Sequence, residues 1–226
     1  TFVVTSLLET YAAAERIFKI EDAVPETHEP EHPVKCGEIQ SIEFKDVTFA
    51  YPNTDKNILE HFSYTINRGD RVGIVGESGA GKSTILRLLL RFYAPTSGQI
   101  LINGIPLENI SFEELHKRIV FLEQDTYLFD ATIAENISIA RPDATPDEIR
   151  RAARRAGIAD FIDTLPDGYN TDMGQMSARL SGGERQRAWI AMTVCQQPEI
   201  LILDEPTTYL DPAAQFMVME LLSEVQ

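Results

Sequence analysis

Hydrophobic and polar residues follow two different periods along this chain of 226 residues. Alternation at every second position and short apolar runs between turn residues predict strands over these ranges: Ser41–Phe49, Phe62–Ile66, Arg71–Val75, Gln99–Ile102, Ile119–Leu122 and Ile200–Leu203. Apolar residues at helical spacing predict helices over another set: Thr1–Asp22, Lys82–Phe92, Thr132–Ile139, Thr145–Ala156, Ala159–Thr164, Glu184–Cys195 and Phe216–Val225. Strands that alternate with helices predict an α/β fold.

Residues 23–38 interrupt this pattern. They contain Pro25, Pro30 and Pro33, few apolar residues and many carboxylates. This composition predicts a linker between the first helix and the strand-rich part of the chain. The run of acidic residues, which begins at Glu21, is most simply a solvated surface of that linker.

The net charge of -15 and the sequence pI of about 4.6 decide against one class of partner. A protein that binds duplex nucleic acid ordinarily presents a basic face, so no nucleic-acid partner is expected. Cys36 and Cys195 have no zinc-type spacing and are expected to be reduced thiols. No apolar run is long enough to span a bilayer. The start at Thr1, without a charged n-region, argues against a signal peptide and suggests a piece of a longer protein.

A glycine-rich stretch carries the first chemical motif. The pattern G-x-x-x-x-G-K-[ST] is matched at every position by Gly76, Glu77, Ser78, Gly79, Ala80, Gly81, Lys82 and Ser83. It follows a predicted strand and opens a predicted helix, where converging backbone N–H groups and the helix N-terminus favour phosphate. Lys82 would neutralise the β- and γ-phosphates of ATP, the Ser83 hydroxyl would bind Mg²⁺, and Thr84 continues the nucleotide-binding set. The alternative is a chance glycine-rich turn.

Two carboxylates end the apolar run Ile200–Leu203. A buried strand does not end in both Asp204 and Glu205 without a role for them. Asp204 would reach Mg²⁺ through water, and Glu205 would be the general base that polarises the attacking water. Alone this pattern is weak, because many strands end in aspartate. With a phosphate-binding loop in the same sheet, it indicates an ATPase.

The stretch Leu180–Gln186, which reads LSGGERQ, predicts a second anion site. Ser181, Gly182 and Gly183 precede a predicted helix, whose N-terminal N–H groups and dipole favour an anion. One chain cannot easily use two phosphate sites on one nucleotide. A head-to-tail pair uses both, because each chain then offers Ser181 and Gly183 to the ATP that the other holds.

These three motifs, in this order and spacing, resemble the nucleotide-binding domain of an ABC transporter, from about Glu38 to the end of the chain. The resemblance implies a P-loop NTPase (RecA-like) core with an antiparallel β subdomain and an α-helical subdomain at about residues 125–185. It also implies that Tyr51 stacks on adenine, that Gln124 touches Mg²⁺ and the transport domain, and that Asp211 lies at the dimer interface. Without the resemblance, Tyr51 would be interpreted as a core aromatic and Gln124 would have no role.

The N-terminal residues narrow the resemblance to exporters that carry membrane and ATPase domains on one chain. Glu9–Phe18, which reads ETYAAAERIF, is similar to the cytoplasmic end of the last membrane helix of such exporters. Residues 1–22 would then be the end of that helix, 23–38 the linker and 39–226 the ATPase domain, its C-terminal part missing. An ordinary docking helix is the alternative for the first range. The implied partners are a second nucleotide-binding domain, in a homo- or heterodimer, and the transmembrane domain of the same parent chain, at the cytoplasmic face of a membrane.

One residue of the family has no counterpart here. The family carries a switch histidine after the catalytic glutamate, whereas all histidines of this chain precede Glu205: His28, His32, His61 and His116. The resemblance therefore implies an ATPase that drives export, with weak activity in this truncated piece. A soluble ABC ATPase and a non-catalytic half of a heterodimeric transporter stay open as alternatives. A small P-loop kinase has no use for the LSGGERQR sequence.

Overall fold

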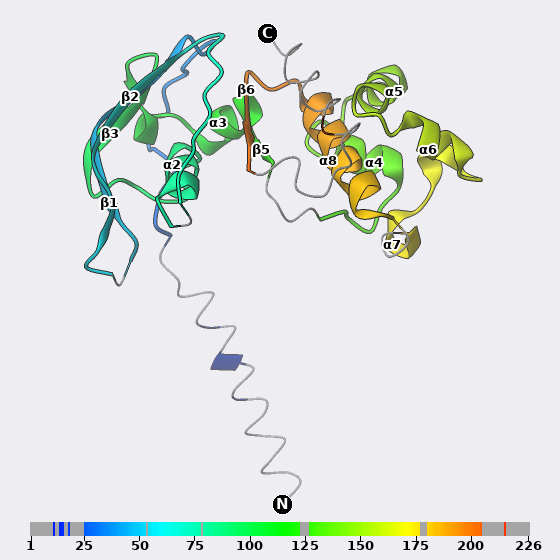
Figure 1. Ribbon diagram of the computed structural model, residues 1–226, viewed down its shortest axis with the longest axis horizontal. Helices are drawn as coiled ribbons and strands as arrows, with labels where there is room; N and C mark the ends of the chain where they lie inside the picture. Colours follow the sequence, from blue (N-terminus) through cyan, green and yellow to red (C-terminus); the bar gives the residue numbers. More distant parts are fainter. Residues whose placement is uncertain are drawn as a thin grey trace, which may run out of the picture.

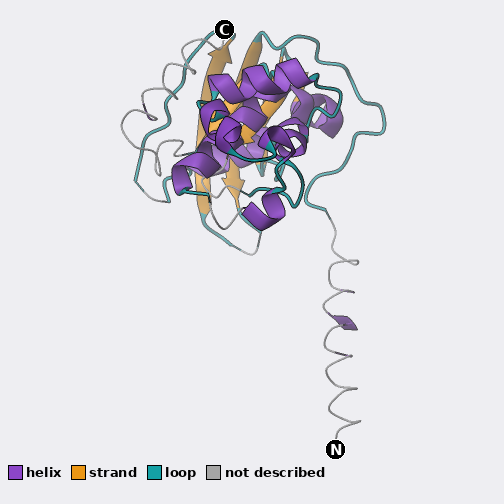
Figure 2. Ribbon diagram, turned by 90° about the vertical axis from the view of Figure 1, so that its right-hand side faces the viewer, coloured by secondary structure: helices purple, strands orange, loops and turns teal. Residues whose placement is uncertain are grey.

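The computed structural model describes residues 25–52, 54–77, 79–122, 127–176 and 180–204, together with the single residues 11, 14, 15, 18 and 215. Two lobes stand side by side within these residues, one built around a sheet and one built from helices (Figure 1). Two short strands stand between the lobes. In a view from the helical side, the helices lie in front of the strands (Figure 2).

The sheet lobe contains the strands β1 Ser41–Ala50, β2 Asn57–Asn67, β3 Ser97–Ile102 and β4 Ile105–Pro106, in the antiparallel order β2-β1-β3-β4. Alternation buries Ile42 and Phe44 on one face of β1. The register shifts after Phe44, where Asp46 has a positive φ of 51°. This bulge returns Val47 to the buried face despite its odd spacing from Phe44. The strands predicted at Ser41–Phe49, Phe62–Ile66 and Gln99–Ile102 are confirmed.

Two helices pack on the buried face of this sheet, α2 Lys82–Leu89 and α3 Phe112–Arg118. Leu88 of α2 and Leu115 of α3 are fully enclosed in one core with residues of β1 and β3. A 3₁₀ turn, η1 Leu107–Asn109, leads into α3, whose first turn is capped by Ser111 accepting the N–H of Glu114 at 3.2 Å. The predicted helix at Lys82 is confirmed, although it ends before Phe92, and α3 was not predicted.

The strands between the lobes are β5 Ile119–Leu122 and β6 Ile200–Leu203, which pair in parallel and in register from Ile119–Ile200 to Leu122–Leu203. Side chains of these strands enter both cores: Ile119 and Ile202 pack with the sheet lobe, whereas Leu122 packs with the helices. A strand covered on both faces needs a continuous apolar run, as both sequences have. The strands predicted at Ile119–Leu122 and Ile200–Leu203 are confirmed.

The helical lobe contains α4 Ile133–Ser138, α5 Pro146–Arg155, α6 Ala159–Thr164, the 3₁₀ turn η2 Gly168–Asn170, α7 Met173–Met176 and α8 Gly182–Gln196. Capping boxes fix the starts of three of these helices, with the residue pairs Thr132–Glu135, Thr145–Glu148 and Ser181–Glu184. The predicted helices at residues 132–139, 145–156, 159–164 and 184–195 are confirmed, with small shifts at their ends.

The strand predicted at Arg71–Val75 is wrong. These residues form no ladder with any described strand, and all of them are exposed. Val75 exposes 93% of its surface, which no buried strand would do. A strand needs hydrogen bonds from a neighbour, and within the described residues β5 pairs with β6 alone, so apolar composition is insufficient here.

The N-terminal part is described only in places. Tyr11, Ala14, Glu15 and Phe18 are helical, as predicted, while the rest of residues 1–22 and the predicted helix at 216–225 lie outside the described residues. No described helix is long and apolar enough to cross a membrane. Residues 25–40 contain neither helix nor strand, but Cys36 and Ile39 are buried in the core of the sheet lobe. The predicted linker therefore lies against the sheet lobe and is not fully solvated.

Gly98→Ala is expected to lower the free energy of unfolding by about 3 kcal/mol, because φ at Gly98 is +82° and a Cβ would stand 2.3 Å from the carbonyl oxygen of Asp46. Gly104→Ala is the matched control, since Gly104 has a φ of +77° but no atom within 4 Å of a Cβ. The control should lose only the backbone cost of about 1–2 kcal/mol. Urea unfolding measures both, and equal losses would contradict the steric explanation.

Candidate functional site

The glycine-rich loop leads directly into α2. Gly79 and Gly81 have φ of +83° and +89°, a conformation that favours glycine. Gly81 is the N-cap of α2, and a Cβ there would stand 3.1 Å from Leu59 of β2. The backbone N–H of Ala80 donates to the carbonyl of Glu77 at 3.1 Å, which closes a turn inside the loop. The loop thus presents the N-terminal end of α2, where N–H groups lack intrahelical partners.

The Lys82 side chain folds back over this loop. Its Nζ donates to the carbonyl oxygens of Gly76 at 2.8 Å and Glu77 at 2.9 Å. An ammonium group carries three N–H donors, so these two bonds leave one donor for a further acceptor. The same contacts hold the positive charge at the mouth of the loop, where a phosphate would meet both the lysine and the helix N-terminus.

Ser83 and Asp204 meet, although they lie far apart in the sequence. The Ser83 hydroxyl donates to Oδ2 of Asp204 at 3.3 Å. Asp204 is held at the end of β6 by its own backbone N–H, which donates to the carbonyl of Leu122 in β5 at 3.0 Å. The parallel strand pair therefore carries this carboxylate to the first turn of α2.

Tyr51 lies beside the same helix. Its hydroxyl is 3.0 Å from the hydroxyl of Thr84, which is buried, and it accepts a hydrogen bond from Arg87 at 3.3 Å. The ring packs edge-on against Phe49 and Tyr93, with centroid distances of 5.0 and 5.2 Å. Tyr51 is thus half-buried in an aromatic cluster beside α2. It packs as a core aromatic, and it also lies close to the helix that follows the glycine-rich loop.

The LSGG residues occupy the start of α8, as predicted. Ser181 is the N-cap, and its hydroxyl accepts the N–H of Glu184 at 3.2 Å while it donates to the Glu184 carboxylate at 2.8 Å. Gly182 and Gly183 form the first turn of the helix. This end of α8 lies beside α7, on the opposite side of β5 and β6 from α2 (Figure 1). The structure therefore does not bring Ser181 to the phosphate loop of its own chain.

Four other predicted site residues lie outside the described part of the chain: Ser78, Gln124, Glu205 and Asp211. Their proposed roles stay predictions. Glu205 directly follows Asp204 in the sequence, and Gln124 lies two residues beyond the end of β5, so both continue from strand ends whose positions are described.

Asn136 has a positioning role that the sequence analysis missed. Its side-chain amide in α4 donates to the carbonyls of Phe129, Ala131 and Thr132 at 3.1, 3.2 and 3.0 Å, and its Oδ1 accepts the N–H of Phe129 at 2.8 Å. This buried side chain fixes the turn before α4. The available signal was an asparagine on the apolar side of a short helix, where it is unfavourable without local backbone partners.

The same turn is tied to the segment that precedes α8. The N–H of Ile133 donates to the carbonyl of Thr171 at 3.0 Å, and the N–H of Met173 donates to Ala131 at 2.9 Å. The Asp130 carboxylate lies against Gly174, where a Cβ would overlap it, so this side chain also packs between the two segments. Hydrogen bonds therefore connect the turn before α4 with residues 171–173, at the start of α7.

The two thiols lie apart from these groups. Burial raises the pKa of Cys36 and of Cys195, so both are protonated at neutral pH. Both are free, in agreement with the prediction of reduced thiols.

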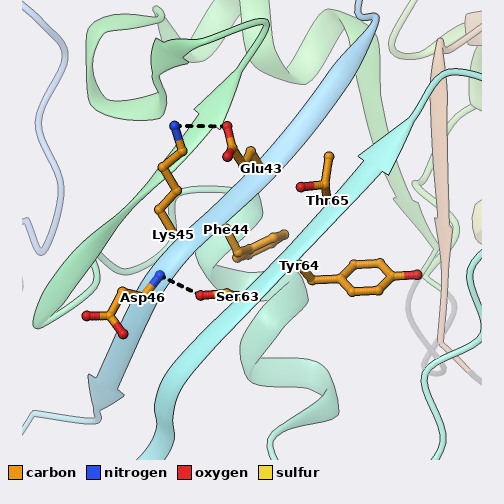
Figure 3. A pocket seen from close by; sticks show the side chains of 7 residues that line it. All are labelled: Glu43, Phe44, Lys45, Asp46, Ser63, Tyr64 and Thr65. Atoms are coloured by element: carbon orange, nitrogen blue, oxygen red, sulfur yellow. Dashed lines mark hydrogen bonds and ion pairs between the residues drawn. The ribbon is translucent and has the colours of Figure 1, made fainter.

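A shallow depression of about 540 Å³ lies on the outer part of β1 and β2 (Figure 3). It is lined by Glu43, Phe44, Lys45, Asp46, Ser63, Tyr64 and Thr65. None of these is a predicted site residue. Its lysine is paired, with Lys45 Nζ 3.1 Å from the Glu43 carboxylate. The depression is therefore a surface feature of the sheet and not the candidate site.

Residues 59–208 match the ABC transporter family. Over 98% of its length, the chain is 42% identical to a probable ABC transporter ATP-binding/permease protein of Haemophilus influenzae, of which it covers 40%. The chain belongs to the ABC transporter family. The fold of this ABC ATPase domain matches a bacterial Atm1-family ABC exporter with ATP bound, with a TM-score of 0.85, 38% identity, 99% of this chain covered and 40% of that chain. The predicted α/β fold with antiparallel β and helical subdomains is confirmed.

A further relative is an ATP-dependent lipid A-core flippase of Syntrophus aciditrophicus, 39% identical over 226 residues, of which the ABC domain covers 37%. The chain therefore spans about 40% of the length of the relatives that it matches. The predicted recognition of an exporter-type ABC ATPase domain is confirmed by these matches.

Asn136→Ala is expected to destabilise the helical lobe by about 2–3 kcal/mol, because it removes the hydrogen bonds of a buried side chain to the backbone of residues 129–132. Amide hydrogen exchange of residues 127–133 should accelerate more than exchange in the sheet lobe. Asn67→Ala, at an exposed position of β2, is the control and should change stability by less than about 0.5 kcal/mol. Equal effects of the two substitutions would contradict the positioning role.

Proposed function

We propose that this chain is the ATP-binding and ATP-hydrolysing domain of an ABC exporter and that it drives efflux through a transmembrane domain of the same parent polypeptide. The observation that carries this proposal is the contact between Ser83 and Asp204 at 3.3 Å. It joins the first turn after the phosphate loop to the carboxylate at the end of β6, which is the pair of groups that a Mg-nucleotide site requires.

ATP binding follows from the loop and α2. Backbone N–H groups at the N-terminus of α2 would receive the phosphate oxygens, and the helix dipole adds to their attraction. The remaining donor of Lys82 would contact the β- and γ-phosphates. Tyr51 would contact the base through the exposed part of its ring, while its hydroxyl lies 3.0 Å from the hydroxyl of Thr84.

The residues present fit Mg²⁺. The Ser83 hydroxyl and the Asp204 carboxylate are hard oxygen ligands on adjoining elements, and Mg²⁺ prefers few protein oxygens together with phosphate and water. Among the described residues, no cluster of three or more His, Cys, Asp and Glu side chains could hold a metal ion by itself. When bound, Mg²⁺ neutralises charge on the phosphates, and Gln124 is proposed to complete its surroundings.

Hydrolysis requires a base for the attacking water. We assign this role to Glu205, because it directly follows Asp204, the proposed metal ligand, in the sequence. Its carboxylate would accept the water proton, while Lys82 and the helix N-terminus stabilise charge on the phosphoryl oxygens. Phosphoryl transfer depends mainly on positioning and charge stabilisation, which these groups supply.

Two chains are needed to complete the site. Ser181 and Gly183 stand at the start of α8, away from α2 of the same chain (Figure 1). A head-to-tail dimer would bring this helix N-terminus to the γ-phosphate held by the partner, with Asp211 at the interface. ATP would then hold the dimer together, and hydrolysis would release it. The domain would work at the cytoplasmic face of a membrane.

Lys82→Ala is expected to weaken Mg-ATP binding by about tenfold to a hundredfold, because a charge-assisted hydrogen bond to phosphate is lost. Isothermal titration calorimetry on the folded chain measures the dissociation constant. Lys45→Ala is the control, because Lys45 is an exposed lysine on β1 whose partner is Glu43. If both variants bound Mg-ATP as tightly as the unmodified chain, the phosphate loop assignment would be wrong.

Ser83→Ala and Asp204→Asn are expected to remove most of the dependence of ATP affinity on Mg²⁺. Ser83→Ala removes the hydroxyl ligand, and Asp204→Asn removes the negative charge of the carboxylate, while Lys82 and the loop N–H groups stay in place. The measurement compares ATP titrations in excess Mg²⁺ with titrations in a chelator. Ser63→Ala, a hydroxyl on β2, should keep the full Mg²⁺ dependence. An unchanged dependence in both site variants would rule out this metal site.

A further inference from the structure

Arg91 is a buried charge directly after the helix of the phosphate loop. It exposes 5% of its surface, and among the described residues it is the one charged side chain in the buried set. Its φ of 59° turns the chain away from α2. Burial lowers the pKa of its guanidinium, whereas Glu29 and Glu108 raise it. A buried charge needs several partners, so its contacts identify what it holds.

The guanidinium joins two segments that are far from each other in sequence. One terminal nitrogen donates to the carbonyl of Ile110, and the other donates to the carbonyl of His28 at 2.6 Å. The guanidinium carbon also lies 4.2 Å from the centre of the Phe112 ring, which is a cation–π contact. The planar fork of arginine can make these contacts together, whereas a lysine ammonium cannot.

Residues 27–34 form a strap across this site. The Thr27 hydroxyl donates to the backbone carbonyl of Arg91 at 2.7 Å. The Glu29 carboxylate accepts the N–H of Phe112 at 3.0 and 3.3 Å. At the other end, the N–H of Val34 donates to the carbonyl of Asn109 at 2.7 Å. The strap is therefore fixed at both ends. At its N-terminal end, Arg91 contacts Thr27 through its backbone carbonyl and His28 through its side chain.

A single short helix connects the strap with the phosphate loop. α2 spans Lys82–Leu89, which is about 12 Å at 1.5 Å per residue. Its first residue bonds the loop carbonyls, and its hydrogen bonds continue into the N–H groups of Leu90 and Arg91. His116 of α3 lies with Nε2 3.3 Å from the carbonyl of Leu90, which secures the same end. A change at one end of α2 thus reaches the other through one rigid element.

We propose that Arg91 is a positioning residue that couples the nucleotide state of the phosphate loop to the docking of the strap at residues 27–34. This inference rests on the proposed function. Phosphate in the loop would fix the N-terminus of α2 and thereby order the whole helix. Docking of the strap on the C-terminal end of α2 would then cost less conformational entropy. The coupling is reciprocal, because a docked strap must then favour ATP by the same factor. In an exporter that carries both domains on one chain, the strap would lie between the ATPase domain and the membrane helices.

Amide hydrogen exchange of the complete chain tests this coupling. The exchange rate of peptides that cover residues 27–36 is measured with and without saturating Mg-ATP. In the unmodified chain, ATP is expected to slow exchange of the Val34 amide by about fivefold or more. Arg91→Lys removes the bridge between two carbonyls, and Thr27→Val removes the hydroxyl donor from a half-buried position outside the core. Both variants should lose the slowing by ATP, and calorimetry should show weaker ATP binding by the same factor.

Arg68→Ala is the control, because it removes an exposed ion pair to Glu38, four residues beyond the strap in the sequence, and leaves α2 unchanged. It should keep the response of the strap to ATP. If ATP binds the unmodified chain and leaves strap exchange unchanged, this inference is overturned while the proposed function stands. If calorimetry detects no ATP binding, both are overturned. If the variants only lower thermal stability and keep the ATP response, Arg91 is a structural anchor and the coupling is refuted.

Discussion

The parallel pairing of β5 and β6 is the constraint on which the rest of the molecule depends. Both strands are short, yet their side chains enter the cores of both lobes, with Ile202 on one side and Leu122 on the other. The Asp204 N–H donates to the carbonyl of Leu122, which carries the backbone pairing one residue beyond the strands. If this pairing were lost, the lobes would share no sheet, and the carboxylate of Asp204 would lose its place beside Ser83.

The phosphate loop is held from one side. Its C-terminal side continues into α2, whose Leu88 is enclosed in the sheet core. Its N-terminal side, residues 71–76, is exposed and joins no strand ladder among the described residues. Local stability follows buried contacts and protected hydrogen bonds, so the loop depends on α2 and on the bonds of Lys82 to Gly76 and Glu77. This asymmetry makes α2 the element through which the loop communicates with the remainder of the domain.

Much of the fold could be predicted because its causes are local in sequence. Alternation identified β1, and apolar residues at helical spacing identified α5. The features that could not be predicted depend on residues that are far away in the sequence or on a turn that has already folded. Arg71–Val75 has the composition of a strand, but a strand exists only where another lies beside it. Arg91 reads as an ordinary surface arginine, because its partner His28 lies 63 residues away. The sequence shows an asparagine at position 136, but its four hydrogen bonds to the backbone exist only once the turn before α4 has folded.

The acidic character of the chain shows why short-range geometry must control binding of an anion. A net charge of -15 opposes a polyanion such as ATP at long range. At physiological ionic strength, exposed charges are screened beyond about 8 Å, so most of these carboxylates act weakly on the loop. The attraction must therefore come from groups within contact distance, namely Lys82 and the N–H groups at the start of α2. Their position is set by Gly81 and by packing against β2, so the proposed preference of the site for phosphate rests on backbone conformation and not on the overall charge.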